Sequence, residues 1–254
     1  ADPTLDVEGI DAAEKLTLLA FKAFGAYVPP AQVHTEGVTR ISQVDIRLAL
    51  ELNHRIKLVA AARRDRGELS LRVHPALVHR GELLADVDSE FNAIILEGPG
   101  FKEMTFLGKG AGELPTASAV LNDIVKMVRQ PDTSTLPGFR RAESRAELAD
   151  TSALKLCYFL RLQADPPKVN DVLTALGNLG LEVLSHAQVE HGGANYLGVI
   201  TDVIEESRMM SALTELGKTA GVGQTPVFLR LDKDNYRDIV EREQSTYFGT
   251  SLER

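Results

Sequence analysis

The stretch LEVLSHAQVEHGGANYLGVI, residues 181–200, decides the fold of the C-terminal half. Its two apolar, strand-like runs are joined through His-Gly-Gly-Ala at 191–194, so it predicts a β-hairpin. A helical segment and a further strand-like run flank the hairpin on each side, at 154–163, 168–180, 206–221 and 225–232. This is the βαββαβ order of ferredoxin-like folds, and its strands suit one sheet with a face packed on two helices.

The N-terminal half alternates helices with strand pairs. A helix is predicted over 11–26, and a second one follows Ser42 and Asp45, which have the spacing of a capping box. Strands are predicted at 55–64, 68–78, 91–98 and 103–110, and a glycine-rich turn then opens a helix over 110–130. The predicted fold class is α+β: a mixed α/β first domain with an open sheet covered by helices, followed by the ferredoxin-like domain.

A domain boundary is predicted where apolar periodicity is lost and Pro, Ser, Thr and charged residues dominate. This gives a first domain over 1–130, a linker over 131–152, a second domain over 153–232 and a C-terminal extension over 233–254.

Composition narrows the class of protein. The chain has 254 residues, 44% of them hydrophobic and 25% charged, as in soluble globular proteins. Its net charge of −8 argues against nucleic-acid binding, because no excess of Lys and Arg is present to contact phosphates. No run is long and apolar enough for a membrane span, and no signal peptide is recognisable, so we expect a cytoplasmic protein. Cys157, the only cysteine, is expected to be a buried, inert thiol.

The N-terminal segment DVEGIDAAEK, residues 6–15, carries the candidate chemistry. Asp11 and Lys15 are four positions apart, so on a helix they share a face and can touch. An ordinary exposed ion pair is one interpretation. An active site is the other, because a glycine lets the backbone bend before an apolar helix and acids crowd the first eleven residues, at positions 2, 6, 8 and 11.

Other polar residues receive structural interpretations. Lys57 is expected to be a paired or snorkelling lysine in a buried strand, with substrate contact as the alternative. His74 is expected to be a structural histidine at a strand end rather than an acid/base, and Glu36 a turn acid. No histidines and acids have metal-ligand spacing, so no metal is predicted.

Residues 1–15 (ADPTLDVEGIDAAEK) resemble the segment of homoserine dehydrogenases that carries the substrate-binding acids and the catalytic lysine. The resemblance continues to about residue 130 and includes TEGVTRISQVDIRLALELNHRIKLVAAA (35–62), RVHPALV (72–78), FNAIILEG (91–98) and GKGAGELPTASAVLNDIV (108–125). The terminal βαββαβ segment is similar to an ACT domain, an amino-acid-sensing module often found in this family.

The resemblance implies NAD(P)-dependent interconversion of L-homoserine and L-aspartate 4-semialdehyde, in threonine, methionine and isoleucine biosynthesis. Asp6 and Asp11 are then substrate-binding acids, and Lys15 is the acid/base, with Asp11 beside it in the catalytic pair. We expect Lys15 to rest as an ammonium and to donate a proton when the aldehyde is reduced, so that oxidation favours alkaline conditions. Lys15 and Asp11 are expected to project into a polar cavity that receives the substrate.

The family's nucleotide-binding Rossmann domain is missing, because no G-x-G-x-x-G follows a strand and opens a helix near the start of the chain. The chain therefore resembles the C-terminal part of the family, and alone it is expected neither to turn over nor to bind NAD(P)H tightly. Gly110, Ala111 and Gly112 are cofactor-binding candidates by resemblance; a plain glycine-rich connection is the alternative. The choice between NAD and NADP stays open.

ACT domains usually carry Asp-x-Pro-Gly after the first strand, whereas Asp165, Pro166 and Pro167 are followed here by Lys168. This replacement makes a threonine effector doubtful. A homodimer or homotetramer is expected by resemblance. The alternative function is a non-catalytic, amino-acid-binding regulatory or oligomerisation module of the ACT type.

Overall fold

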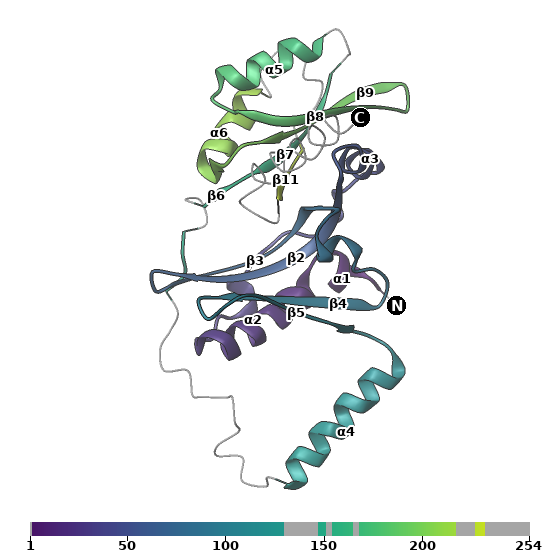
Figure 1. The fold of residues 1–254 in the computed structure, drawn as a ribbon, viewed down its shortest axis with the longest axis vertical. Coiled ribbons are helices and arrows are strands. Elements are labelled where there is room, and N and C mark those ends of the chain that lie inside the picture. The colour runs from purple at the N-terminus through teal and green to yellow at the C-terminus, as the bar shows by residue number, and fades with distance from the viewer. Residues whose placement is uncertain (1, 130–146, 151–153, 165–167, 217–226, 232–254) are drawn as a thin grey trace, which may run out of the picture.

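The structure, a computed structural model, describes residues 2–129, 147–150, 154–164, 168–216 and 227–231 (Figure 1). A seven-stranded mixed sheet runs through it. Its strands are β1 (His34–Thr35), β2 (His54–Asp65), β3 (Glu68–His79), β7 (Tyr158–Gln163), β8 (Val183–His191), β9 (Ala194–Thr201) and β11 (Val227–Leu231). The strand order is β1-β3-β11-β7-β9-β8, with β2 on the other edge of β3.

Strands β2 and β3 form the predicted hairpin. They pair antiparallel from His54 opposite His79 to Asp65 opposite Glu68. The turn between them is left-handed at Arg66 (φ 48°) and Gly67 (φ 95°). Two positive φ values in succession match the right-handed twist of the strands and hold the register of this long hairpin.

The edge of β3 opposite β2 receives strands from both halves of the chain. β1 pairs with it in parallel at Arg72 and Val73, and β11 pairs with it in parallel at Ala76 and Leu77. The sheet therefore continues from the N-terminal into the C-terminal half. The predicted division at 131–152 stays a prediction; most of that segment lies outside the described residues, and within it Ala149 donates its N–H to the carbonyl of Leu69 at 2.8 Å.

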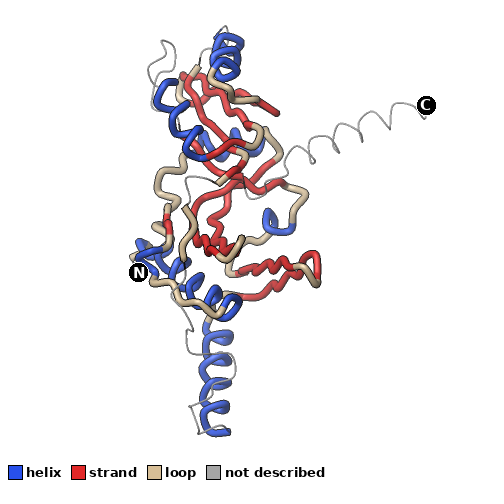
Figure 2. Tube along the Cα trace, turned by 90° about the vertical axis from the view of Figure 1, so that its left-hand side faces the viewer, coloured by secondary structure: helices blue, strands red, loops and turns tan. Residues whose placement is uncertain are grey.

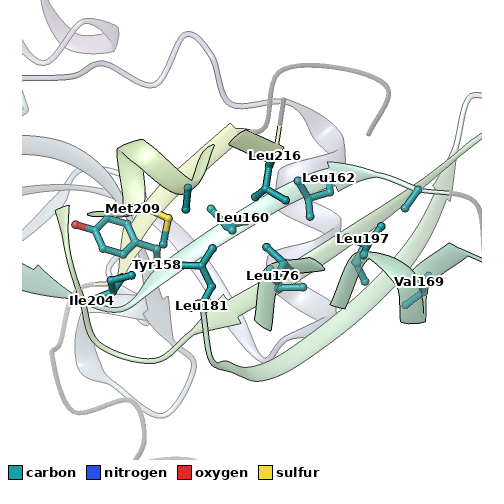
Figure 3. Packing of buried hydrophobic residues seen from close by; sticks show 14 of the residues in the cluster. Tyr158, Leu160, Leu162, Val169, Leu176, Leu181, Leu197, Ile204, Met209 and Leu216 are labelled. Carbon is teal, nitrogen blue, oxygen red and sulfur yellow. The ribbon is translucent and has the colours of Figure 1, made fainter. Parts of the chain in front are cut away.

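The βαββαβ order predicted for the C-terminal half is confirmed. Along the chain, α5 (Val169–Asn178) lies between β7 and β8, and α6 (Glu206–Leu216) lies between β9 and β11. All neighbouring pairs among these four strands are antiparallel. Gly192 and Gly193 form the β8–β9 turn with φ values of 61° and 76°. Both helices cover one face of the sheet over a core that includes Tyr158, Leu160, Leu176, Leu197 and Met209 (Figure 3).

The opposite face of the same sheet is covered by α3 (Gln43–Glu51), from the N-terminal half. The predicted capping box begins this helix, because Ser42 and Asp45 exchange side-chain-to-backbone hydrogen bonds. Leu48 and Cys157 are fully buried between helix and sheet, which confirms the buried thiol. A Cβ at Gly198 would lie 2.9 Å from the ring of Phe159 and 3.2 Å from Leu48 of α3, so the absence of a side chain here lets α3 approach β9 closely.

Helix α2 (Ile10–Phe24) packs on β2 and β3 and corresponds to the helix predicted over 11–26. Its buried side chains Ala13, Leu16 and Ala20 meet Leu71 and Val73 of β3. A short preceding helix, α1 (Thr4–Val7), was not predicted. The remaining small elements are η1 (Pro30–Gln32), η2 (Leu83–Asp86), β6 (Lys155–Leu156) and β10 (Ile204–Glu205).

The hairpin of β4 (Phe91–Gly98) and β5 (Phe101–Lys109) is a separate two-stranded sheet, followed by α4 (Glu113–Arg129). Helix α4 has no buried residue and projects away from the rest of the structure (Figures 1 and 2). Within the described part of the chain, no helix has both the length and the hydropathy of a membrane span.

Candidate active site

The candidate pair lies in the first turns of α2. Gly9 precedes the helix with φ +76°, which turns the chain from α1 into α2. Lys15 Nζ lies 2.5 Å from Asp11 Oδ2, so the expected contact one helical turn apart is present. Their side chains are 59% and 41% exposed, respectively. The described residues therefore leave the pair open to solvent and do not enclose the polar cavity expected around it.

Asp6 lies in α1 and is exposed. Among the described residues, no hydrogen bond or ion pair connects Asp6 with Asp11 or Lys15. The structure thus brings two of the three predicted residues into contact, and the catalytic and substrate-binding roles of all three stay predictions.

The segment that follows β1 contacts the residues immediately before α2. The N–H of Val38 donates to the carbonyl of Val7 at 2.7 Å, and the N–H of Glu36 donates to the carbonyl of Val73 at 2.8 Å. A Cβ at Gly37 would lie 2.6 Å from Glu8 Cα and closer still to Val7 O. The absence of a side chain at position 37 therefore lets the two backbones touch.

A cluster of charged side chains joins this segment to the C-terminal half of the chain. Arg230 of β11 donates through Nη1 to Glu36 Oε1 at 2.8 Å and through Nε to Glu206 Oε2 at 3.1 Å. The Tyr158 hydroxyl also donates to Glu206, at 3.2 Å. Only 3% of the Arg230 side chain is exposed, against 19% for Glu36 and 13% for Glu206, so a buried guanidinium is neutralised by two partly buried carboxylates.

The cluster changes the pKa values of its members. Burial alone raises the pKa of Glu36, but the hydrogen bond with His34 and the positive charge of Arg230 outweigh burial and lower it to about 2. Burial, reinforced by the charges of Arg230 and Arg72, lowers the pKa of His74 to about 4. Glu36 is therefore a partly buried carboxylate of an ion-pair network and not the simple turn acid expected. His74 is buried in the middle of β3, not at a strand end as expected, and is neutral near pH 7.

Lys57 has the paired role that was predicted. Its Nζ donates to Asp88 Oδ1 at 2.7 Å and to the carbonyl of Val87 at 2.6 Å.

The cofactor candidates Gly110, Ala111 and Gly112 form the exposed turn between β5 and α4. The N–H of Gly110 donates to the carbonyl of Glu90 at 2.8 Å, and Gly112 has φ +121°. In the described part of the structure, no hydrogen bond or ion pair joins this turn to Asp11 or Lys15.

Two further expectations concern sites for other ligands. The described residues contain no group of three or more His, Cys, Asp or Glu side chains placed to hold a metal ion. In the loop after β7, Asp165, Pro166 and Pro167 lie outside the described residues, and Lys168 occupies the N-cap position of α5.

The sequence interpretation missed Arg230 and Arg161, which both hold elements from different halves of the chain together. Arg161 donates to the buried carboxylate of Asp45 at 2.6 Å, across the junction between α3 and the sheet. A signal was present, because each arginine lies between two leucines in an apolar strand (Phe-Leu-Arg-Leu). A buried guanidinium in such a strand requires a carboxylate partner.

A family model described as homoserine dehydrogenase matches residues 1–125. Over these residues the chain is similar to homoserine dehydrogenases. The homoserine dehydrogenase of Pseudomonas aeruginosa is 34% identical over 249 residues, which cover 92% of this chain and 57% of the relative. That of Bacillus subtilis is 38% identical over 129 residues, which cover 51% of this chain and 30% of the relative.

The crystal structure of a homoserine dehydrogenase from Thiobacillus denitrificans has a TM-score of 0.80 and 32% identity, and the match covers 92% of this chain and 56% of that one. The mixed α/β fold described above is therefore similar to that of homoserine dehydrogenases. The chain spans 57% of the length of the Pseudomonas aeruginosa enzyme and 56% of the Neisseria gonorrhoeae enzyme, which is itself 32% identical.

Proposed function

We propose that this chain provides the substrate-binding and proton-transfer part of a homoserine dehydrogenase. The reaction interconverts L-homoserine and L-aspartate 4-semialdehyde, with NAD(P) as the oxidant or NAD(P)H as the reductant. The contact of Lys15 Nζ with Asp11 Oδ2, placed at the start of α2 within the matched residues, is the observation that carries the proposal.

In the proposed mechanism, Lys15 handles the proton on the substrate oxygen. In the reducing direction its ammonium donates that proton as the aldehyde carbon receives a hydride; in the oxidising direction its neutral amine accepts the hydroxyl proton. Asp11 orients Lys15 and contacts the substrate near the reacting end. Asp6 supplies a carboxylate for the substrate ammonium, because a small zwitterion needs an acid as partner.

The cofactor, when bound, supplies or accepts the hydride. The turn at Gly110, Ala111 and Gly112 fits close approach of a cofactor edge, since it is exposed and carries little side-chain bulk. It does not amount to a dinucleotide site by itself, and we propose that this polypeptide alone neither turns over nor binds NAD(P)H tightly.

Three features complete the proposal. The C-terminal βαββαβ unit is an ACT-type domain, the chain assembles as a homodimer or homotetramer, and the protein acts in the cytoplasm in threonine, methionine and isoleucine biosynthesis. Lys168, in place of the usual glycine, weakens or abolishes a threonine effector site.

Binding of L-homoserine to the 254-residue chain tests the proposed function. Calorimetric titration is expected to show binding that is lost in Lys15→Met. The matched control is Lys126→Met, which removes another exposed intrahelical Lys–Asp pair, 3.6 Å apart, from α4. Equal affinity in wild type and Lys15→Met would contradict the role of Lys15.

The second candidate is an ACT-type regulatory module without catalytic function, favoured by the βαββαβ order of β7 to β11. It predicts that threonine raises the melting temperature while homoserine and NAD(P)H leave it unchanged. The enzymatic proposal predicts a shift with homoserine.

A further inference from the structure

The segment His34–Val38 touches both halves of the chain. Towards the N-terminus, Val38 bonds to Val7, Gly37 lies against Glu8, and a Cβ at Gly9 would be only 3.3 Å from the Thr35 methyl group. These contacts cover the residues at which α1 turns into α2. The position of this segment therefore decides where the first turns of α2 lie.

Glu36 connects the same segment to the C-terminal half through an ion pair. Glu36 Oε1 accepts hydrogen bonds from Arg230 at 2.8 Å and from His34 at 2.7 Å, and the Glu36 side chain is 19% exposed. Arg230 is in turn held by the two carboxylate oxygens of Glu206, the first residue of α6. Planar, bidentate pairing of this kind fixes direction as well as distance.

The path from Arg230 to α2 is short and consists of direct contacts. Glu36 and Gly37 are adjacent, so a shift of the Glu36 backbone moves the Gly37–Glu8 contact and the Val38–Val7 hydrogen bond together. β3 pairs with the strands at both ends of the path, with β1 at Val73 and with β11 at Ala76. The pairing of β3 and the hydrogen bond from the Glu36 N–H to Val73 limit the motion of the backbone up to Glu36. The Glu36–Arg230 ion pair adds a second anchor, from the C-terminal half.

We propose that Glu36 and Arg230 are positioning residues: their ion pair anchors the C-terminal half to the segment that holds Val7, Glu8 and Gly9, and so fixes Asp11 and Lys15 for substrate. The catalytic meaning of this inference rests on the function proposed above, whereas the mechanical coupling does not. Neither residue touches the substrate in this proposal.

Backbone hydrogen exchange, read by NMR on the 254-residue chain, tests the coupling directly. Arg230→Met and the milder Glu36→Gln are expected to accelerate exchange of the Val38 amide at least about tenfold relative to the core of β8 and β9, because local opening follows the loss of the anchor. Arg230→Lys, which keeps the charge, is expected to restore part of the protection.

Arg161→Met is the matched control, because Arg161–Asp45 is also a buried ion pair between the two halves, at 2.6 Å, but leads to α3. It is expected to lower stability without selective exchange at Val38. If Glu36→Gln leaves exchange at Val38 unchanged, or if Arg161→Met accelerates it as much, the coupling is overturned.

Homoserine titration separates this inference from the proposed function. Weaker binding in Glu36→Gln, with Val38 exchange accelerated, supports both. Loss of protection at Val38 in a chain whose wild type does not bind homoserine supports the coupling and counts against the proposed function. Unchanged homoserine affinity in Glu36→Gln, despite faster exchange at Val38, overturns the positioning role.

Discussion

Gly37→Ala directly perturbs the contact on which the start of α2 depends. The new Cβ would lie 2.6 Å from Glu8 Cα, whereas ordinary van der Waals contact begins at 3.4 Å. The backbones must therefore separate by at least about 0.8 Å, the difference between these distances, because Val7 O lies closer still and neither contacting atom belongs to a flexible side chain. Overpacking of this kind costs about 1–3 kcal/mol.

The same separation stretches the 2.7 Å hydrogen bond from the Val38 N–H to Val7 O. Its loss adds about 1 kcal/mol, so the free energy of unfolding is expected to fall by about 2–4 kcal/mol in total. In urea unfolding followed by circular dichroism, the midpoint is then expected to fall by about 1 M. Homoserine affinity is expected to fall as well, because Asp11 and Lys15 move with α2.

Gly177→Ala is the matched control. Gly177 lies in α5, has open space where a Cβ would stand, and is exposed, so alanine is expected to stabilise by up to about 1 kcal/mol through helix propensity. If Gly37→Ala unfolds at the wild-type urea concentration and its Val38 amide exchanges at the wild-type rate, the close approach of the two backbones has no energetic importance and the reasoning is refuted.

Three further predictions follow. Burial and two arginines lower the pKa of His74 to about 4, so the unfolded chain binds more protons than the folded one between about pH 6.5 and pH 4. The contribution of neutral His74 to the free energy of unfolding is therefore expected to be fully present above about pH 6.5 and to be lost as the pH falls to about 4. Urea titrations at each pH are expected to give a flatter dependence on pH for His74→Asn. Gly198→Val is expected to lower the melting temperature by several degrees, because even a Cβ there would lie 2.9 Å from Phe159 and 3.2 Å from Leu48; an unchanged melt would contradict the packing of α3 on β9. Lys15→Met is expected to change the free energy of unfolding by less than about 1 kcal/mol, because its ion pair is exposed, and a larger loss in urea unfolding would assign Lys15 a structural role.

Local features of the fold could be predicted from sequence because their causes lie within a few residues. The Ser42–Asp45 capping box, the turns at Gly67 and Gly192 and the order of strands and helices in the C-terminal half each depend on neighbouring side chains and backbone angles. The contact of Asp11 with Lys15 follows from helical spacing alone. The solvent exposure of the pair does not follow from helical spacing, because it depends on which other parts of the structure lie beside α2.

The sequence by itself determined the longer helices and strands, their order and the resemblance of the first 130 residues to homoserine dehydrogenases. Only the tertiary structure decided that β11 pairs with β3, that α3 covers the second face of the ferredoxin-like sheet, and that Arg230 binds Glu36 across 194 positions of the chain. The physical reason is that strand pairing and buried charge pairing are selected among many distant partners. Packing and desolvation of the whole sheet make that selection, which the local pattern around either residue does not encode.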